Sequence, residues 1–266
     1  MNGPRRILLP CMLGAHLCTL AQTPPVVLVN EVKATRPWEP REEYSFPRIV
    51  MPERPAVAQR INRHLCGELL EVDPDAAGNA LFANVWGDSA GTWMPRLNYL
   101  TWSTAHPCAE LLDVLIEGEA CGAYCEGFSS HYVYDLRDGR ALTFDSLFTT
   151  AGATAVNDSL YRRWVRTLGD HIATTLDGMA VEGQSTEDLE RSRAMLEMYR
   201  YCMEQRPDGE PYVTDIVPFA GGIGFFLARC ASHVEQELDE LDPLRFDLST
   251  AWLAQHLRPE MRALFR

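Results

Sequence analysis

EGEACGAYCEGFSSHYVYDLRDGRALTFDSLF, residues Glu117–Phe148, is the stretch of the chain that decides the fold. Within Phe128–Leu136, four apolar or aromatic side chains share even spacing, which is the period of a β-strand. The pair Asp138-Gly139 then supplies residues that tolerate positive φ, as a tight hairpin turn requires. Residues Ala141–Phe144 return as the partner strand, and Asp145 is placed to cap a short helical turn. The stretch therefore predicts an antiparallel hairpin followed by a helix start.

Helical and strand patterns continue on both sides of this hairpin. Apolar residues at every fourth position predict a helix that begins at Pro55 and is ended by Asp73–Asp75 and Gly78, and another helix over Val156–Ile172. Ser185 opens a further helix with a sequence that resembles a capping box. Strand-like runs follow at Tyr212–Phe219 and Gly224–Ala228. This order of elements predicts an α+β fold, with an antiparallel sheet and helices packed mainly on one face.

The N-terminus has the pattern of an export signal. Two arginines precede a mostly apolar run of 14 residues, Ile7–Leu20, which is too short to span a bilayer and fits a signal peptide. We therefore expect a signal peptide over residues 1–21, an exposed lead-in over 22–43 with one apolar run that favours an early strand, and a single domain over 44–266. No other apolar run is long enough for a transmembrane segment, so a periplasmic or secreted location is predicted.

The chain is acidic, with a formal net charge of -13 that becomes -15 once the two arginines of the signal are removed. This charge argues against a nucleic-acid partner, which normally needs a basic face. It suits a cationic protein partner, although a net charge of this sign can also serve solubility alone.

Six cysteines remain after residues 1–21, and an even number in an exported chain suggests disulfides. Sequence cannot choose among the 15 pairings of six cysteines. Proximity favours Cys121–Cys125, and the flanking of one hairpin region favours Cys202–Cys230, which leaves Cys66 and Cys108 as the third pair. Buried free thiols are the alternative.

No motif in the sequence predicts a catalytic residue, a cofactor or a bound metal. Cys121, Cys125 and His131 form an incomplete metal set, for which a disulfide is the better explanation in an exported chain. Glu117, Glu119 and Glu126 cluster near Cys121, and two of them could flank a glycosidic bond. Acidic residues are common in this chain, so a solvated rim is the simpler interpretation.

The hairpin resembles the extracytoplasmic domain of the lysozyme-sensing anti-sigma factors of the RsiV type, which also precedes some peptidoglycan deacetylase modules. The resemblance rests on Tyr132–Leu136, the turn at 137–140, Ala141–Phe148, and the loop Cys121–Tyr124 in the place of a Gly-Gly-Ala-type loop. Further motifs in the same order extend it over residues 44–257. It implies a fold and a tendency to bind cell-wall hydrolases, and it implies no catalytic activity.

These observations favour an exported, non-enzymatic binding protein of the cell envelope. Its partner would be a cationic, lysozyme-like peptidoglycan hydrolase that it inhibits or gives immunity to. The predicted contacts are Glu119, Tyr124, Glu126 and Phe128, in a loop that the Cys121–Cys125 disulfide would hold in one conformation. The alternatives are an envelope glycan hydrolase that uses a carboxylate pair, and a structural envelope protein.

Overall fold

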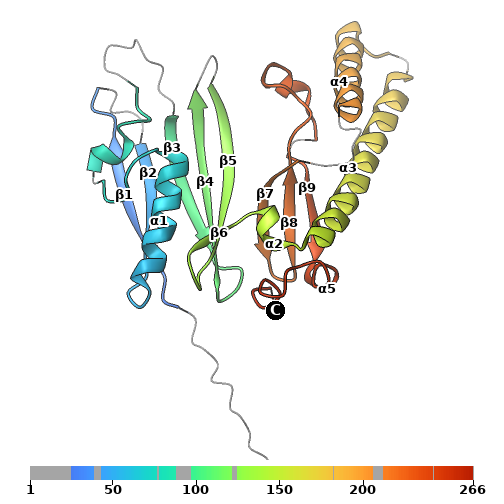
Figure 1. The fold of residues 1–266 in the computed structure, drawn as a ribbon. Helices are drawn as coiled ribbons and strands as arrows, with labels where there is room; N and C mark the ends of the chain where they lie inside the picture. Colours follow the sequence, from blue (N-terminus) through green and yellow to red (C-terminus); the bar gives the residue numbers. More distant parts are fainter. Residues whose placement is uncertain are drawn as a thin grey trace, which may run out of the picture.

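The computed structural model describes residues 25–38, 43–76, 78–87, 97–121, 125–181, 183–205, 212–241 and 243–265. These residues form two β-sheets that stand side by side, with helices on one side of them (Figure 1). The α+β prediction is confirmed. The predicted signal peptide at 1–21 lies outside the described residues. Within the described ranges, no helix is both long and apolar enough to cross a membrane.

The larger sheet has six strands in sequence order. They are β1 (Leu28–Thr35), β2 (Glu43–Val50), β3 (Leu97–Ala105), β4 (Leu111–Cys121), β5 (Cys125–Asp135) and β6 (Arg140–Leu142). All neighbours pair antiparallel except β2 and β3, which pair in parallel through Tyr44 and Leu100. The parallel junction departs from the predicted antiparallel sheet because a helix, α1 (Pro55–Leu69), lies between these two strands in the chain and carries it back across the sheet.

The smaller sheet has three antiparallel strands, β7 (Val213–Phe219), β8 (Gly222–Leu227) and β9 (Arg245–Ser249). Strand β7 lies beside β5 of the larger sheet, where the backbone N–H of His131 donates to Asp215 Oδ1 at 2.9 Å. The seam between the two sheets is thus bridged by a side chain.

Helices cover one side of both sheets (Figure 1). Helix α1 packs on the larger sheet, and α3 (Thr150–Met179) lies by the smaller sheet with α4 (Thr186–Glu204) against it. Four shorter helical segments complete the fold: η1 (Gly78–Phe82), α2 (Phe144–Leu147), η2 (His233–Leu238) and α5 (Thr250–Leu253). The predicted cap of α4 is confirmed, since Ser185 Oγ accepts from the Asp188 N–H at 3.1 Å.

Two separate clusters of buried side chains stabilise the two sheets. One lies between α1 and the larger sheet and includes Ile61, Leu65 and Ile116. The other lies mainly among α3, α4 and the smaller sheet, where it includes Trp164 and Phe225, and it also takes in Leu111 and Val133 of the larger sheet. Residue Trp164 is fully buried in the second cluster, and Trp86 is buried in the first.

Two local predictions were wrong. Helix α2 is capped by Thr143 and not by Asp145, because the Thr143 hydroxyl accepts from the Ser146 N–H while Ser146 Oγ accepts from the Thr143 N–H. The pairing of Cys66 with Cys108 is also wrong, since both thiols are free. Cys66 belongs to the core of the larger sheet and Cys108 packs against the core of the smaller one, so their sulfurs lie in different cores.

The segment predicted as an exposed lead-in contains β1, which pairs with β2 along its whole length. Val29 and Val32 of β1 pack against the core, and Ala34 is buried. The guanidinium of Arg36, next after the strand, is buried and donates to the carbonyl of Leu97 at 3.0 Å. This part of the lead-in is therefore an integral strand of the larger sheet.

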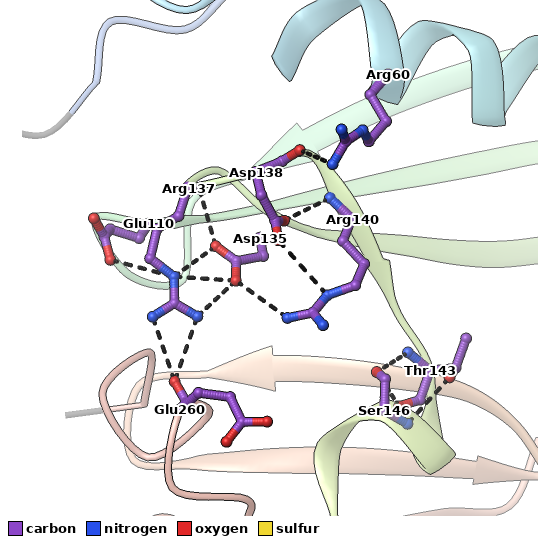
Figure 2. A network of polar contacts seen from close by, with 9 residues as sticks. All are labelled: Arg60, Glu110, Asp135, Arg137, Asp138, Arg140, Thr143, Ser146 and Glu260. Atoms are coloured by element: carbon purple, nitrogen blue, oxygen red, sulfur yellow. Dashed lines mark hydrogen bonds and ion pairs between the residues drawn. The ribbon is translucent and has the colours of Figure 1, made fainter. Parts of the chain in front are cut away.

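A polar network joins the end of the β5–β6 hairpin to the C-terminal segment (Figure 2). The carboxylate of Asp135 is buried and accepts from Arg137 Nε at 2.9 Å and Nη2 at 2.6 Å. The same guanidinium donates to the Glu260 carbonyl at 3.3 and 3.4 Å. Because the C-terminal segment packs into the core of the smaller sheet, this network ties the two halves of the structure together.

Candidate recognition surface

The long β4–β5 hairpin ends in a covalently closed tip. The two strands pair without interruption from Leu111 and Asp135 to Cys121 and Cys125, and those two cysteines form a disulfide. The second predicted disulfide, Cys202–Cys230, is also present and joins the end of α4 to the segment after β8. The predicted contact Tyr124 lies outside the described residues.

The register of the hairpin places two of the predicted contacts on opposite faces. Glu119 is paired with Gly127, whereas Glu126 is paired with Ala120. Paired residues point to the same face of a sheet and successive residues point to opposite faces. Glu119 therefore lies on the face without helices, and Glu126 and Phe128 lie on the face that carries α1.

Among the described residues, the open face of the hairpin is acidic, and an exposed aromatic ring on the neighbouring strand β3 lies beside it. Glu117 and Glu119 lie two residues apart on β4, beside Thr101 and Tyr99 of β3. Tyr99 is 41% exposed. Glu119 is half-buried and accepts a hydrogen bond from the side-chain amide of Asn98, while Glu117 is exposed. This face has the residue types of a protein-binding surface with negative charge.

On the opposite face, the two remaining predicted contacts hold the fold together. Glu126 forms an ion pair with Arg229, which follows β8, so this contact joins the hairpin to the second half of the structure. The ring of Phe128 packs against the core of the larger sheet and over Gly118. A Cβ at Gly118 would lie 2.9 Å from that ring and 2.7 Å from the Tyr99 carbonyl oxygen, so the close approach requires glycine.

A polar cluster at the seam between the sheets was not predicted from the sequence. His131 Nδ1 lies 3.0 Å from both carboxylate oxygens of the buried Asp113, and its ring stacks on Phe226 of β8 with centroids 5.9 Å apart. Burial raises the pKa of the nearby Asp215 carboxyl, although its hydrogen bond from the His131 N–H opposes the shift. The signal in the sequence was the single acid within the apolar run Leu111–Ile116.

One group of side chains in the described ranges has metal-ligand spacing. A carboxylate oxygen of Glu119 and the sulfurs of Cys121 and Cys125 lie within 4.8 Å of one another. Both sulfurs are joined in the disulfide, so neither is a thiolate that could bind a metal. His131, the third candidate ligand in the sequence, is instead engaged with Asp113.

The fold is similar to two solved structures of the DUF3298 family. A protein of this family from Pseudomonas aeruginosa PAO1 superposes with a TM-score of 0.52 at 10% sequence identity, covering 90% of this chain and 96% of that one. A member from Bacteroides fragilis NCTC 9343 gives a TM-score of 0.55 at 13% identity, covering 92% and 99%. These likenesses show a shared fold. No family profile matches the sequence, and no curated protein matches it either.

Proposed function

We propose that this chain is a non-enzymatic binding protein of the cell envelope that recognises a cationic protein, with a lysozyme-like peptidoglycan hydrolase as the partner. The observation that carries the proposal is the acidic open face of the hairpin, where Glu117 and Glu119 stand beside the exposed ring of Tyr99. A basic partner surface would complement these carboxylates, and the net charge of -13 would steer it toward them.

The disulfides support this proposal in two ways. Disulfides form and persist in oxidising compartments such as the periplasm, so two of them fit an exported protein. The Cys121–Cys125 bond also holds the ends of β4 and β5 together next to Glu119. A surface held in one conformation loses less entropy on binding than a flexible one.

Capture of a c-type lysozyme by the immobilised protein tests the proposal. We expect capture at low ionic strength, about 10–20 mM, and weaker capture at about 150 mM salt, since exposed charges are screened there. The double variant Glu117→Lys/Glu119→Lys should lose capture. The matched control Glu190→Lys/Glu197→Lys changes the net charge equally on exposed positions of α4, which packs on α3 and η2, and it should retain capture. Equal loss of capture in both variants would show that capture depends on net charge alone and not on the open hairpin face.

A glycan hydrolase is the second candidate, because Glu117 and Glu119 share a face. Two residues along a strand span about 6.6 Å, near the lower end of the carboxylate separation of inverting glycosidases, roughly 6.5–9.5 Å. Against this, the pair lies on an open sheet face, and the large cleft of the molecule is lined by neither residue. Release of sugar ends from peptidoglycan that disappears in Glu117→Gln and Glu119→Gln would favour the hydrolase.

A further inference from the structure

A large cleft lies on the helix-bearing side of the molecule, along the seam between the two sheets. Its volume is about 1180 Å³. One wall is formed by His64 and Glu68 of α1, and the other by residues of α3 such as Asn157. The floor includes Tyr132 of β5 and Thr214 of β7. A cleft of this size exceeds the roughly 300–1,000 Å³ of typical small-ligand pockets, so it has room for a ligand made of several linked rings.

The chemistry of the lining disfavours three classes of ligand, namely extended peptides, anions and apolar molecules. An extended peptide would bind by adding a strand to β5, but the N–H of His131 is already taken by Asp215. An anion would meet the carboxylates of Glu68 and Asp215. Among the described lining residues the only arginine or lysine is Arg258, whose guanidinium donates to the carbonyls of Phe148 and Asp145.

An apolar ligand would have to cover hydroxyl, amide and carboxylate groups without hydrogen bonds, which is costly. Hydroxyl groups on the ligand would instead pair with them. Burial, together with the negative charges of Asp215 and Glu68, raises the pKa of Tyr132 to about 12, so its phenol remains a hydrogen-bond donor at neutral pH. Glu68, Tyr132 and Asp215 all line the cleft, so one hydroxyl donor and two carboxylate acceptors are available to neighbouring ligand hydroxyls, each of which both donates and accepts.

We propose that this cleft binds an uncharged, hydroxyl-rich ligand, namely a short oligosaccharide. Its sugar hydroxyls would pair with Glu68, Asp215 and Asn157. The rings of Tyr132 and Tyr212 would cover its C–H faces. Tyr212 lies at the edge of the cleft and is 70% exposed. Without a ligand, water therefore covers most of its ring, and a sugar that stacked on the ring would displace this water.

This site is independent of the proposed protein-binding surface. Glu117 and Glu119 lie on the opposite face of the larger sheet from the walls of the cleft. A variant that loses lysozyme capture should still bind the oligosaccharide, and a variant that loses oligosaccharide binding should still capture lysozyme.

Titration of the ¹⁵N-labelled protein with chitotetraose, followed by two-dimensional NMR, tests the proposal. We expect saturable shifts confined to amides that line the cleft, such as those of Ser130, Thr154 and Thr214. The variant Tyr212→Ala should bind about fivefold more weakly. Its control, Tyr201→Ala, removes another exposed tyrosine on α4, outside the cleft lining, and should bind as the native chain does. Asn157→Ala provides a second cleft variant if Tyr212→Ala fails to fold.

Three results would overturn the proposal. The first is the absence of saturable shifts with chitotetraose, cellotetraose and maltotetraose at about 10 mM, a concentration at which even millimolar affinities give clear saturation. The second is shifts located away from the cleft. The third is cleft shifts with N-acetyl-arginine amide but with none of the neutral sugars, which would show that the carboxylates bind a cation instead.

Discussion

Replacement of Asp135 should destabilise the protein more than any surface charge change. Its carboxylate is 1% exposed and accepts four hydrogen bonds from Arg137, one from the backbone N–H at 2.9 Å and three from the guanidinium (Figure 2). Removing one partner of a buried pair costs about 3–5 kcal/mol. The Arg137 side chain is 33% exposed, so water would compensate part of its lost partner. We therefore expect Asp135→Ala to lower the free energy of unfolding by about 2–3 kcal/mol.

Urea denaturation followed by tryptophan fluorescence measures this change, because Trp86 and Trp164 lie in the two different cores. Asp135→Asn keeps an acceptor oxygen for the Arg137 N–H, so it should lower the free energy of unfolding by about half as much as Asp135→Ala does. Asp158→Ala removes an exposed carboxylate on α3 and should change the stability by less than about 0.5 kcal/mol. If Asp135→Ala lowers the free energy of unfolding no more than this control does, the network does not stabilise the junction between the two halves.

Three further changes test other parts of the structure. Gly118→Ala should lower the free energy of unfolding by about 1–3 kcal/mol, because its Cβ would clash with the Tyr99 carbonyl. Gly67→Ala on α1 has open space around it and should raise the free energy of unfolding by about 0.5–1 kcal/mol. Urea denaturation of the two variants measures both changes. Burial raises the pKa of Cys66 to about 11, so iodoacetamide at pH 8 should alkylate it only after unfolding, as mass spectrometry would show. Burial also raises the pKa of Asp215, so the folded state binds its proton more tightly and stability is lost as pH rises from the unfolded to the folded pKa. Unfolding free energies between pH 4 and 7 should therefore fall less steeply for Asp215→Asn than for the native chain.

Local patterns in the sequence predicted much of the fold. The even spacing in Phe128–Leu136 and the Asp-Gly turn predicted the hairpin of β5 and β6, although β6 ends at Leu142 and not at Phe144. The four-residue repeat predicted the start of α1 at Pro55, although the helix ends at Leu69, before the expected stop at Asp73–Asp75. Short-range signals suffice here because each element buries one face that is defined by its own periodicity. The cap at Thr143 was missed because Thr143, Asp145 and Ser146 all have capping side chains, and only the backbone geometry selects among them.

The site was harder to predict because it depends on contacts between distant parts of the chain. Which face Glu119 and Glu126 occupy follows from the hairpin register, which the composition of the tip does not fix. The partners of Glu126 and of His131, Arg229 and Asp215, lie 103 and 84 residues away. The separation of Cys66 from Cys108 likewise follows from the existence of two cores, which no local pattern predicts.

Calorimetric titration with a c-type lysozyme measures directly whether the open hairpin face binds such a hydrolase. We expect a dissociation constant of about 1 μM or tighter at low ionic strength. The double variant Glu117→Lys/Glu119→Lys should bind at least tenfold more weakly, with no comparable change for Glu190→Lys/Glu197→Lys. Absence of binding to the native chain, or equal weakening in the two double variants, would contradict the assignment of the open hairpin face as the recognition surface.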